Sequence, residues 1–341
     1  MALFRPGPRN LITDVAGILV GNAHDARART GTTVVLPDQR AVAAVDVRGG
    51  GPGTRETDAL DPTALVDAID AVVLSGGSAF GLAAADGAVA WLAARGRGYR
   101  LGPSVVPIVP AAILFDLQNG GDKGWGEEPP YRALAMAACA AAASDFPLGN
   151  QGAGFGAKAG SLKGGLGSAS IQDPASGITL GAVLAANPVG STVMPGQDAL
   201  WAWALELDGE LGGQPQPTGP VPPTVDLPLP AAEPGTNTTI GVIATDADLS
   251  RAEARRIAMA AQDGIARAIR PAHTPFDGDT LFVLATGAVP LPEPRPLSVA
   301  RLGALAADVV ARAIARAVYE AETLGDWPSY RSRHGGSLRQ P

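Results

Sequence analysis

The side chains that usually carry out hydrolytic chemistry are few in this sequence. Its three histidines, His24, His273 and His334, lie far apart, and none stands in an HExxH pattern or at another metal-ligand spacing. His273 falls in a loop, where we expect an ordinary surface turn residue. The single cysteine, Cys139, can form neither an internal disulfide nor a cysteine metal site, and its apolar helical surroundings predict a small buried hydrophobe. We therefore expect neither a metal ion nor a cofactor.

Two glycine-rich segments resemble catalytic motifs only superficially. The loop at residues 75–78 is not a serine nucleophile elbow, because Phe80 stands where glycine is required, and we expect this loop to support the fold. Residues 152–157 match a dinucleotide-binding pattern loosely, since more glycines follow where a helix should begin. Neither Lys158 nor Lys163 lies in a phosphate-binding Walker loop.

A hydroxyl nucleophile can work without histidine when it is the first residue of a chain. The α-amine of an N-terminal Thr or Ser then takes the hydroxyl proton. Its unperturbed pKa, near 8, suits this task at neutral pH. Such a residue must first be released by cleavage of the chain.

One position offers the setting for such a cut. Residues 212–235 hold eight prolines and four glycines, which predicts a linker or an exposed loop. Residues 239–245 then indicate a buried strand, so Asn237 and Thr238 lie where a flexible segment enters a rigid one. A strained peptide bond before a hydroxyl residue can undergo an N-to-O acyl shift and hydrolysis. The same dipeptide occurs by chance in most proteins, so its spacing alone leaves an ordinary junction as the alternative.

Runs of β-branched residues and helical periodicities predict an α/β protein around this junction. Strands are expected at residues 32–36, 41–47, 71–74, 103–110 (an edge), 178–185, 239–245 and 280–286. Helices are expected at residues 79–94, 131–143 and 298–324, and after a capping box formed by Ser250 and Glu253. The polar tail after Trp327 is expected to be mobile.

The composition excludes several classes of protein. The 341 residues are 46% apolar and 17% charged, which excludes disorder for most of the chain. The net charge is −7 and there is no basic run, so neither nucleic acid nor an anionic membrane is an expected partner. Asp14 interrupts the apolar run at residues 11–20, and no stretch approaches about 18 uninterrupted apolar residues. We expect a cytoplasmic protein of enzyme size.

Five groups of residues between positions 8 and 325 form a recognisable set. They are residues 10–15 (NLITDV) with 20–21 (VG), 46–57 (DVRGGGPGTRET), 74–82 (LSGGSAFGL), 163–167 (KGGLG) and 237–246 (NTT to ATD). Together they resemble the DmpA-type peptidase family (L-aminopeptidase/D-esterase), and especially its nylon-oligomer hydrolase branch. A single one of these segments would not be specific.

The resemblance implies an αββα four-layer sandwich of the self-cleaving N-terminal-nucleophile type. It implies one domain, residues 1–341, that is cut into a large chain, 1–237, and a small chain, 238–341, of 104 residues. The new N-terminal residue, Thr238, would be the nucleophile, and Thr after Asn is similar to the nylon-oligomer branch. A closed homotetramer of cleaved heterodimers is the assembly that the resemblance suggests.

Other site residues carry over from the family's motifs. Asn187 matches the asparagine that stabilises the oxyanion. Asp277 and Asp279 match the paired acids of the nylon branch, which would orient the new amine. Lys158 matches the active-site lysine by its distance to Asn187, with Lys163 as the alternative.

Phe115 marks a departure from the aminopeptidases. It falls where those enzymes place a Tyr, so a hydroxyl contact to the oxyanion or the substrate is lost. We expect Phe115 to contact the substrate, and we expect the usual aminopeptidase activity to be altered.

The predicted function is therefore an N-terminal-threonine amide hydrolase that acts on linear amides such as 6-aminohexanoate oligomers. A β-peptidyl or L-aminopeptidase with D-esterase/amidase activity is the first alternative. An acyltransferase similar to ornithine acetyltransferases would pass the acyl group to an amine instead of water. A binding protein that keeps the fold without the activity is the remaining alternative.

Overall fold

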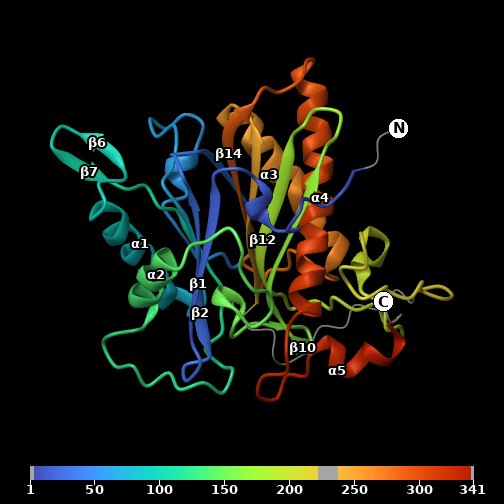
Figure 1. The fold of residues 1–341 in the computed structure, drawn as a ribbon. Coiled ribbons are helices and arrows are strands. Elements are labelled where there is room, and N and C mark those ends of the chain that lie inside the picture. Colours follow the sequence, from blue (N-terminus) through green and yellow to red (C-terminus); the bar gives the residue numbers. More distant parts are fainter. Residues whose placement is uncertain (1–3, 222–236, 339–341) are drawn as a thin grey trace.

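Two five-stranded β-sheets lie face to face, and a pair of helices covers the outer side of each. The computed structural model describes residues 4–221 and 237–338. In Figure 1 the four layers run from left to right: α1 and α2, the sheet with β1 and β2, the sheet with β12 and β14, and then α3 and α4. The expected αββα sandwich is confirmed.

The first sheet has the strand order β1-β2-β5-β8-β4 and the second has the order β11-β12-β13-β14-β3. The strands of the first sheet are β1 (Ile18–Asp25), β2 (Thr30–Pro37), β5 (Val72–Ser75), β8 (Ala111–Ile113) and β4 (Thr54–Arg55). Those of the second are β11 (Gly165–Gln172), β12 (Thr179–Asn187), β13 (Thr238–Ala247), β14 (Thr280–Val289) and β3 (Val42–Val47). Two hairpins are formed by β6 (Tyr99–Leu101) with β7 (Ser104–Val106), and by β9 (Lys158–Ala159) with β10 (Leu162–Lys163). The α-helices are α1 (Ala84–Ala93), α2 (Tyr131–Ala140), α3 (Arg251–Ala268), α4 (Arg295–Tyr319) and α5 (Tyr330–His334).

The alternation of side chains along buried strands builds three separate core layers. In β2, Val35 points between the two sheets, whereas Val34 and Leu36 pack under α1 and α2. In β13, Ile240 points between the sheets and Ile243 packs under α3 and α4. Because both faces of these strands are covered, every residue of β2 and β13 is buried, and the apolar residues come in runs, such as 34–36 and 240–244, without alternating with polar ones.

Several expected elements differ in extent. The helix expected at 79–94 begins as a 3-10 helix, η3 (Ser78–Ala83), and becomes α-helical only in α1. The edge strand expected at 103–110 is only β7, in a hairpin outside the main sheets. Part of the tail expected to be mobile packs against the fold: the Tyr330 side chain is fully buried and its hydroxyl donates to the Asp198 carbonyl at 2.5 Å. The last residues of the tail, 339–341, lie outside the described residues.

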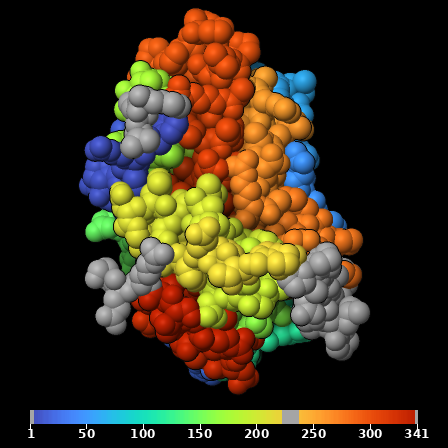
Figure 2. Space-filling model, turned by 90° about the vertical axis from the view of Figure 1, so that its right-hand side faces the viewer, coloured from blue at the N-terminus to red at the C-terminus, as the bar shows by residue number. Residues whose placement is uncertain are grey.

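The segment that leads toward residue 221 is held against the second helical layer. Glu210 makes a buried ion pair with Arg312 of α4, and Gln214 accepts a hydrogen bond from the Leu200 N–H at 2.9 Å. Figure 2 shows this part of the chain, in yellow, lying across one face of the molecule. Residues 212–221 contain no helix or strand, and the rest of the predicted linker lies outside the described residues. Within the described ranges, no helix is long and apolar enough to cross a membrane.

Candidate active site

Thr238 is the first residue of β13, and it pairs directly with Asn187, the last residue of β12. The strand that follows it is buried throughout, which fixes its position in the middle of the second sheet. Asn187, Asn237, Thr238, Asp277 and Asp279 are each at most 2% exposed in the intact chain. The peptide bond between residues 237 and 238 is therefore shielded from bulk solvent.

The carbonyl group of Asn237 lies between two donors. The Thr238 hydroxyl donates to this oxygen through a very short contact, so the hydroxyl oxygen lies against the carbonyl that precedes it. The backbone N–H of Gly278 donates to the same oxygen at 3.0 Å. Asn237 also forms a parallel β-bridge with Asp277, which joins the candidate cut site to the acidic loop.

The side chain of Asn187 is held from two sides. Its Oδ1 accepts the backbone N–H of Lys158 at 2.9 Å, and its Nδ2 donates to the Phe115 carbonyl at 3.1 Å. These bonds identify which end of the amide is nitrogen, since only that end can donate. In the described parts of the chain, the second N–H of Nδ2 has no acceptor, so it can donate to a ligand. The structure thus brings the backbones of Lys158 and Phe115 to the side chain of Asn187, the residue that pairs with Thr238.

The two predicted acids follow each other on the loop that enters β14. Asp277 Oδ2 accepts the Thr274 hydroxyl at 2.6 Å and the Thr274 N–H at 3.1 Å. Asp279 Oδ1 accepts the N–H of Thr239 at 2.8 Å, one residue beyond Thr238. Burial, and then the charge of Asp279, raise the pKa of Asp277 above its ordinary value.

The sequence motif at residues 48–51 supports this acidic loop. The Gly51 N–H donates to the Asp277 carbonyl at 2.8 Å, and the Arg48 N–H donates to the Asp279 carbonyl at 2.9 Å. A β-carbon on Gly49 would lie 2.2 Å from the Asp277 carbonyl oxygen, so only glycine allows this close approach.

The two candidate lysines have different surroundings. Lys163 is fully buried and its Nζ donates to the carbonyls of Gly164 at 2.7 Å and Gly154 at 3.1 Å. Burial lowers the pKa of Lys163 to about 7. Lys158 is half-buried, burial also lowers its pKa, and its Nζ has no hydrogen-bond or ion-pair partner in the described parts of the chain. The Lys158 ammonium group is thus the one available to a ligand.

The amino-acid sequence as a whole can be compared with known proteins. Residues 10–328 match peptidase family S58. The chain belongs to this family. An uncharacterized aminopeptidase of Mycobacterium bovis is 46% identical over 96% of this chain and 99% of its own length. A 6-aminohexanoate-oligomer endohydrolase of Kocuria sp. is 30% identical over 91% of this chain and 86% of its own length.

The solved structures agree with this result. The β-aminopeptidase of a Burkholderia species superposes with a TM-score of 0.70 at 25% identity, covering 95% of this chain and 90% of its own. The expected resemblance to DmpA-type peptidases is confirmed. As a member of family S58, the protein is a hydrolase of amide bonds.

Sequence reasoning missed one contact in this S58 peptidase. His273, expected to be a surface turn residue, has a positive φ of 55° and lies with its ring Nδ1 2.9 Å from Asp279 Oδ2. Burial alone would lower the pKa of His273, but the hydrogen bond and charge of Asp279 raise it overall. His273 and Asp279 stand at the two ends of the sequence HTPFDGD, six positions apart. A histidine and an acid at the two ends of a turn were the only feature of the sequence that could have indicated this contact.

The glycine loop at residues 75–78 supports the S58 site from the first sheet. The Gly77 N–H donates to Asp116 Oδ1 at 2.8 Å, and the Thr30 hydroxyl donates to Asp116 Oδ2 at 2.6 Å. Burial raises the pKa of Asp116 to about 6. Asp116 follows Phe115, whose carbonyl holds Asn187, so this loop helps to fix the position of the asparagine.

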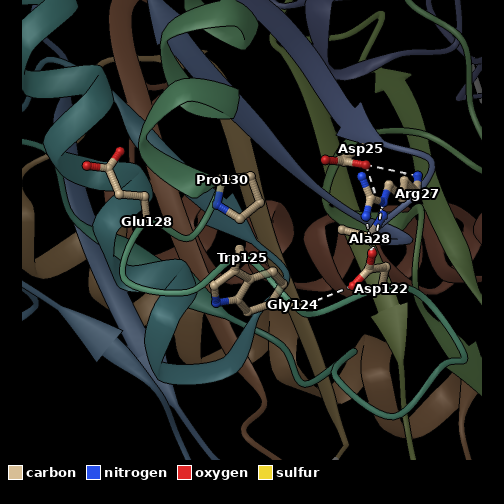
Figure 3. A pocket seen from close by; sticks show the side chains of 8 residues that line it. All are labelled: Asp25, Arg27, Ala28, Asp122, Gly124, Trp125, Glu128 and Pro130. Atoms are coloured by element: carbon tan, nitrogen blue, oxygen red, sulfur yellow. Dashed lines mark hydrogen bonds and ion pairs between the residues drawn. The ribbon is translucent and has the colours of Figure 1, made fainter.

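A separate pocket of about 300 Å³ opens beside the turn between β1 and β2. Figure 3 shows Trp125, Glu128 and Pro130 on one side, and on the other the ion pair that Arg27 makes with Asp122 at 2.5 Å. None of the predicted site residues lines this pocket.

Proposed function

We propose that this S58 peptidase cleaves itself between Asn237 and Thr238 and then uses Thr238 as an N-terminal nucleophile. The observation that carries the proposal is the contact of the Thr238 hydroxyl with the carbonyl of the preceding residue. A hydroxyl in that position can attack its own peptide bond without a histidine. The pairing of Thr238 with Asn187 places an amide donor beside the same nucleophile.

The first stage produces the working enzyme. The Thr238 hydroxyl oxygen bonds to the Asn237 carbonyl carbon, the peptide C–N bond breaks, and the nitrogen takes the proton. Water then hydrolyses the resulting ester, which leaves a carboxylate on Asn237 and a free amine on Thr238. The chain of 341 residues becomes two chains of 237 and 104 residues that remain one folded domain.

The second stage is hydrolysis of a substrate amide. The Thr238 amine takes the hydroxyl proton, and the oxygen attacks the substrate carbonyl carbon. The free N–H of Asn187 stabilises the oxyanion. The substrate C–N bond then breaks as the Thr238 amine passes the proton to the leaving nitrogen, which leaves an ester on Thr238. Water that the same amine activates hydrolyses this ester and releases the acid. Asp277 and Asp279 orient the amine, Lys158 lies beside the hydroxyl, and Phe115 contacts the substrate chain.

Linear amides such as 6-aminohexanoate oligomers are the proposed substrates. The Kocuria relative, named as a 6-aminohexanoate-oligomer endohydrolase, supports this class. An aminopeptidase is the second candidate, favoured by the 46% identity to a protein named as an aminopeptidase and by the β-aminopeptidase fold. Transfer of the acyl group to an added amine such as ornithine would indicate the acyltransferase instead.

The proposal includes a cytoplasmic homotetramer of cleaved heterodimers. Low charge content and Ala-rich helices leave apolar surface that an assembly would cover. Light scattering at micromolar concentration should give about four times the mass of one 34.3 kDa chain. A lone heterodimer at that concentration would contradict the assembly.

Intact mass and N-terminal sequencing of the purified protein test the first stage. The small chain should begin Thr-Thr-Ile-Gly, and Thr238→Ala should remain one inactive chain. A fully active protein that stays uncut would overturn the proposal. Aminohexanoate oligomers, β-alanyl dipeptides and α-peptide amides compared on one preparation test the substrate. Reaction only where a free α-amino group adjoins the scissile bond would establish the aminopeptidase.

A further inference from the structure

We propose that the backbone N–H of Gly278 is the oxyanion donor of the self-cleavage step. This inference rests on the proposed function and assigns a catalytic group to its first stage. The Gly278 N–H donates to the carbonyl oxygen of Asn237 at 3.0 Å, and that carbonyl belongs to the bond to be cut. The Thr238 hydroxyl contacts the same carbonyl. The candidate nucleophile and the donor therefore both contact the carbonyl oxygen of the bond to be cut.

The donor is held rigidly in its position. The Asp277 carbonyl, on the peptide group that carries the Gly278 N–H, accepts the Gly51 N–H at 2.8 Å. The carbonyl of Gly278 itself accepts the Thr280 hydroxyl at 2.9 Å. A donor that is fixed before the reaction stabilises developing charge without reorganisation.

The absence of a side chain at residue 278 also matters for the nucleophile. A β-carbon there would lie 2.9 Å from the Thr238 hydroxyl oxygen and 2.9 Å from the Gly51 carbonyl oxygen. Contacts below 3.0 Å would force one of these atoms to move. Glycine thus lets the backbone N–H approach the carbonyl while it leaves room for the hydroxyl.

The chemistry assigns this donor to one intermediate. When the Thr238 oxygen bonds to the Asn237 carbon, the C=O electron pair moves onto the carbonyl oxygen, and the hydroxyl proton passes to the peptide nitrogen of Thr238. The Gly278 N–H stabilises the resulting oxyanion. The pair then re-forms the C=O bond as the bond between the Asn237 carbon and the protonated nitrogen breaks. The product is an ester to Thr238 with a free amine.

Replacement of Gly278 by glycolic acid in cell-free translation of the full chain tests the assignment. The amide N–H becomes an ester oxygen, so the donor is lost without an added atom. Removal of one oxyanion donor slows an enzymatic step about a hundredfold to a thousandfold. We expect the 341-residue band to convert to fragments at least about a hundredfold more slowly than in the wild type.

Glycolic acid in place of Gly49 is the matched control. It also removes one backbone hydrogen bond of this loop, the one that the Gly49 N–H donates to the Asp279 carbonyl at 3.3 Å, but leaves the peptide group of the Gly278 N–H and the reacting carbonyl untouched. We expect this protein to be cut within a few-fold of the wild-type rate. Equal slowing of the two ester proteins would show that Gly278 only maintains the loop, and the assignment would be wrong.

Hydroxylamine separates the two halves of the reaction, because it cleaves an ester but not the original amide. Because hydroxylamine also cuts the introduced ester between residues 277 and 278, the readout is the fragment of 237 residues, which only a cut before Thr238 produces. Hydroxylamine should not release this fragment from the Gly278 ester protein, since the missing donor blocks formation of the Thr238 ester. Its release by hydroxylamine would overturn the assignment. An uncut wild-type chain would overturn the proposed function itself, whereas a Gly278 ester protein cut at the wild-type rate would overturn only the role of Gly278.

Discussion

His273 contacts Asp279 Oδ2 twice, through its ring Nδ1 at 2.9 Å and through its own backbone N–H at 3.1 Å. The other oxygen of this carboxylate accepts the N–H of Thr239 at 2.8 Å. A turn on the surface is thereby connected to the residue after the candidate nucleophile. Among the described residues, Asp277 and Arg48 also carry charge near this pair.

The His273–Asp279 pair should make stability depend on pH. The folded pKa of His273 is raised above 6.5, so its stabilisation is fully present below pH 6.5 and is lost as the pH rises through the raised pKa. His273→Gln should therefore lower the free energy of unfolding by about 1–2 kcal/mol below pH 6.5 and have less effect at higher pH. Urea unfolding of both proteins over a pH series measures this difference.

His24 provides a control of opposite sign. Burial lowers its pKa, against a smaller effect of Asp25, so the stability of the wild type should fall relative to His24→Gln as the pH drops through 6.5. If the two histidine variants showed the same pH trend, the charge on His273 would not be stabilised by Asp279.

Asn187→Asp should lower kcat for amide hydrolysis about a hundredfold, as is typical for loss of one oxyanion donor. The aspartate keeps an oxygen that can accept the Lys158 N–H, but it replaces the donating nitrogen by a charged oxygen that faces the Phe115 carbonyl, so the loss should be at least this large. Steady-state kinetics on the mature enzyme at neutral pH measure the effect. A kcat that stays within threefold of wild type would remove Asn187 from the oxyanion site.

Asp277→Asn should reduce kcat far more than it raises KM if the acid acts on the Thr238 amine, as proposed, and not on substrate binding. Burial and the charge of Asp279 raise the pKa of Asp277 above 3.8. Wild-type kcat should therefore decline at acid pH with an apparent pKa above 3.8. A pH–rate profile that stays flat down to pH 4 would be inconsistent with an ionised Asp277 in the reaction.

The two lysines should respond differently to replacement by Met. Lys158→Met should abolish most activity with little change in stability, because its ammonium group has no hydrogen-bond or ion-pair partner among the described residues. Lys163 has a pKa of about 7 when folded and 10.5 when unfolded, so wild-type stability should rise with pH between these values. Lys163→Met should not show this rise. Thermal unfolding and activity assays across pH 6–10 distinguish the two residues.

The local elements were largely predictable from the sequence. The Ser250 and Glu253 capping box begins α3 as expected, and the β-branched run after Thr238 forms β13. Strand β11 could not be predicted in this way. It begins in the glycine-rich stretch that ends at residue 167, where residues without side chains give no alternating polar and apolar pattern. The assignment of β2 and β3 to different sheets depends on long-range pairing that no local pattern records.

The candidate site was predictable only in part, for a related reason. Thr238, Asn187 and the two acids could be named because their residue types carry chemistry. Gly278 contributes a backbone N–H, which every residue except proline has, so nothing in its identity points to that contact. The contacts around Asn237 are made by three segments that meet only in the folded chain, so the sequence does not show which groups touch each other.

The strand order of the second sheet has a consequence for the cut protein. Strands β13 and β14 follow residue 238, but their outer neighbours, β12 and β3, precede it. A cut before Thr238 would leave β13 and β14 of the small chain between two strands of the large chain. Eight residue pairs join β13 to β12, and six join β14 to β3. The two polypeptides could separate only by unfolding the sheet. Each small chain would thus keep for its lifetime the large chain with which it was synthesised, and halves from different molecules would not mix.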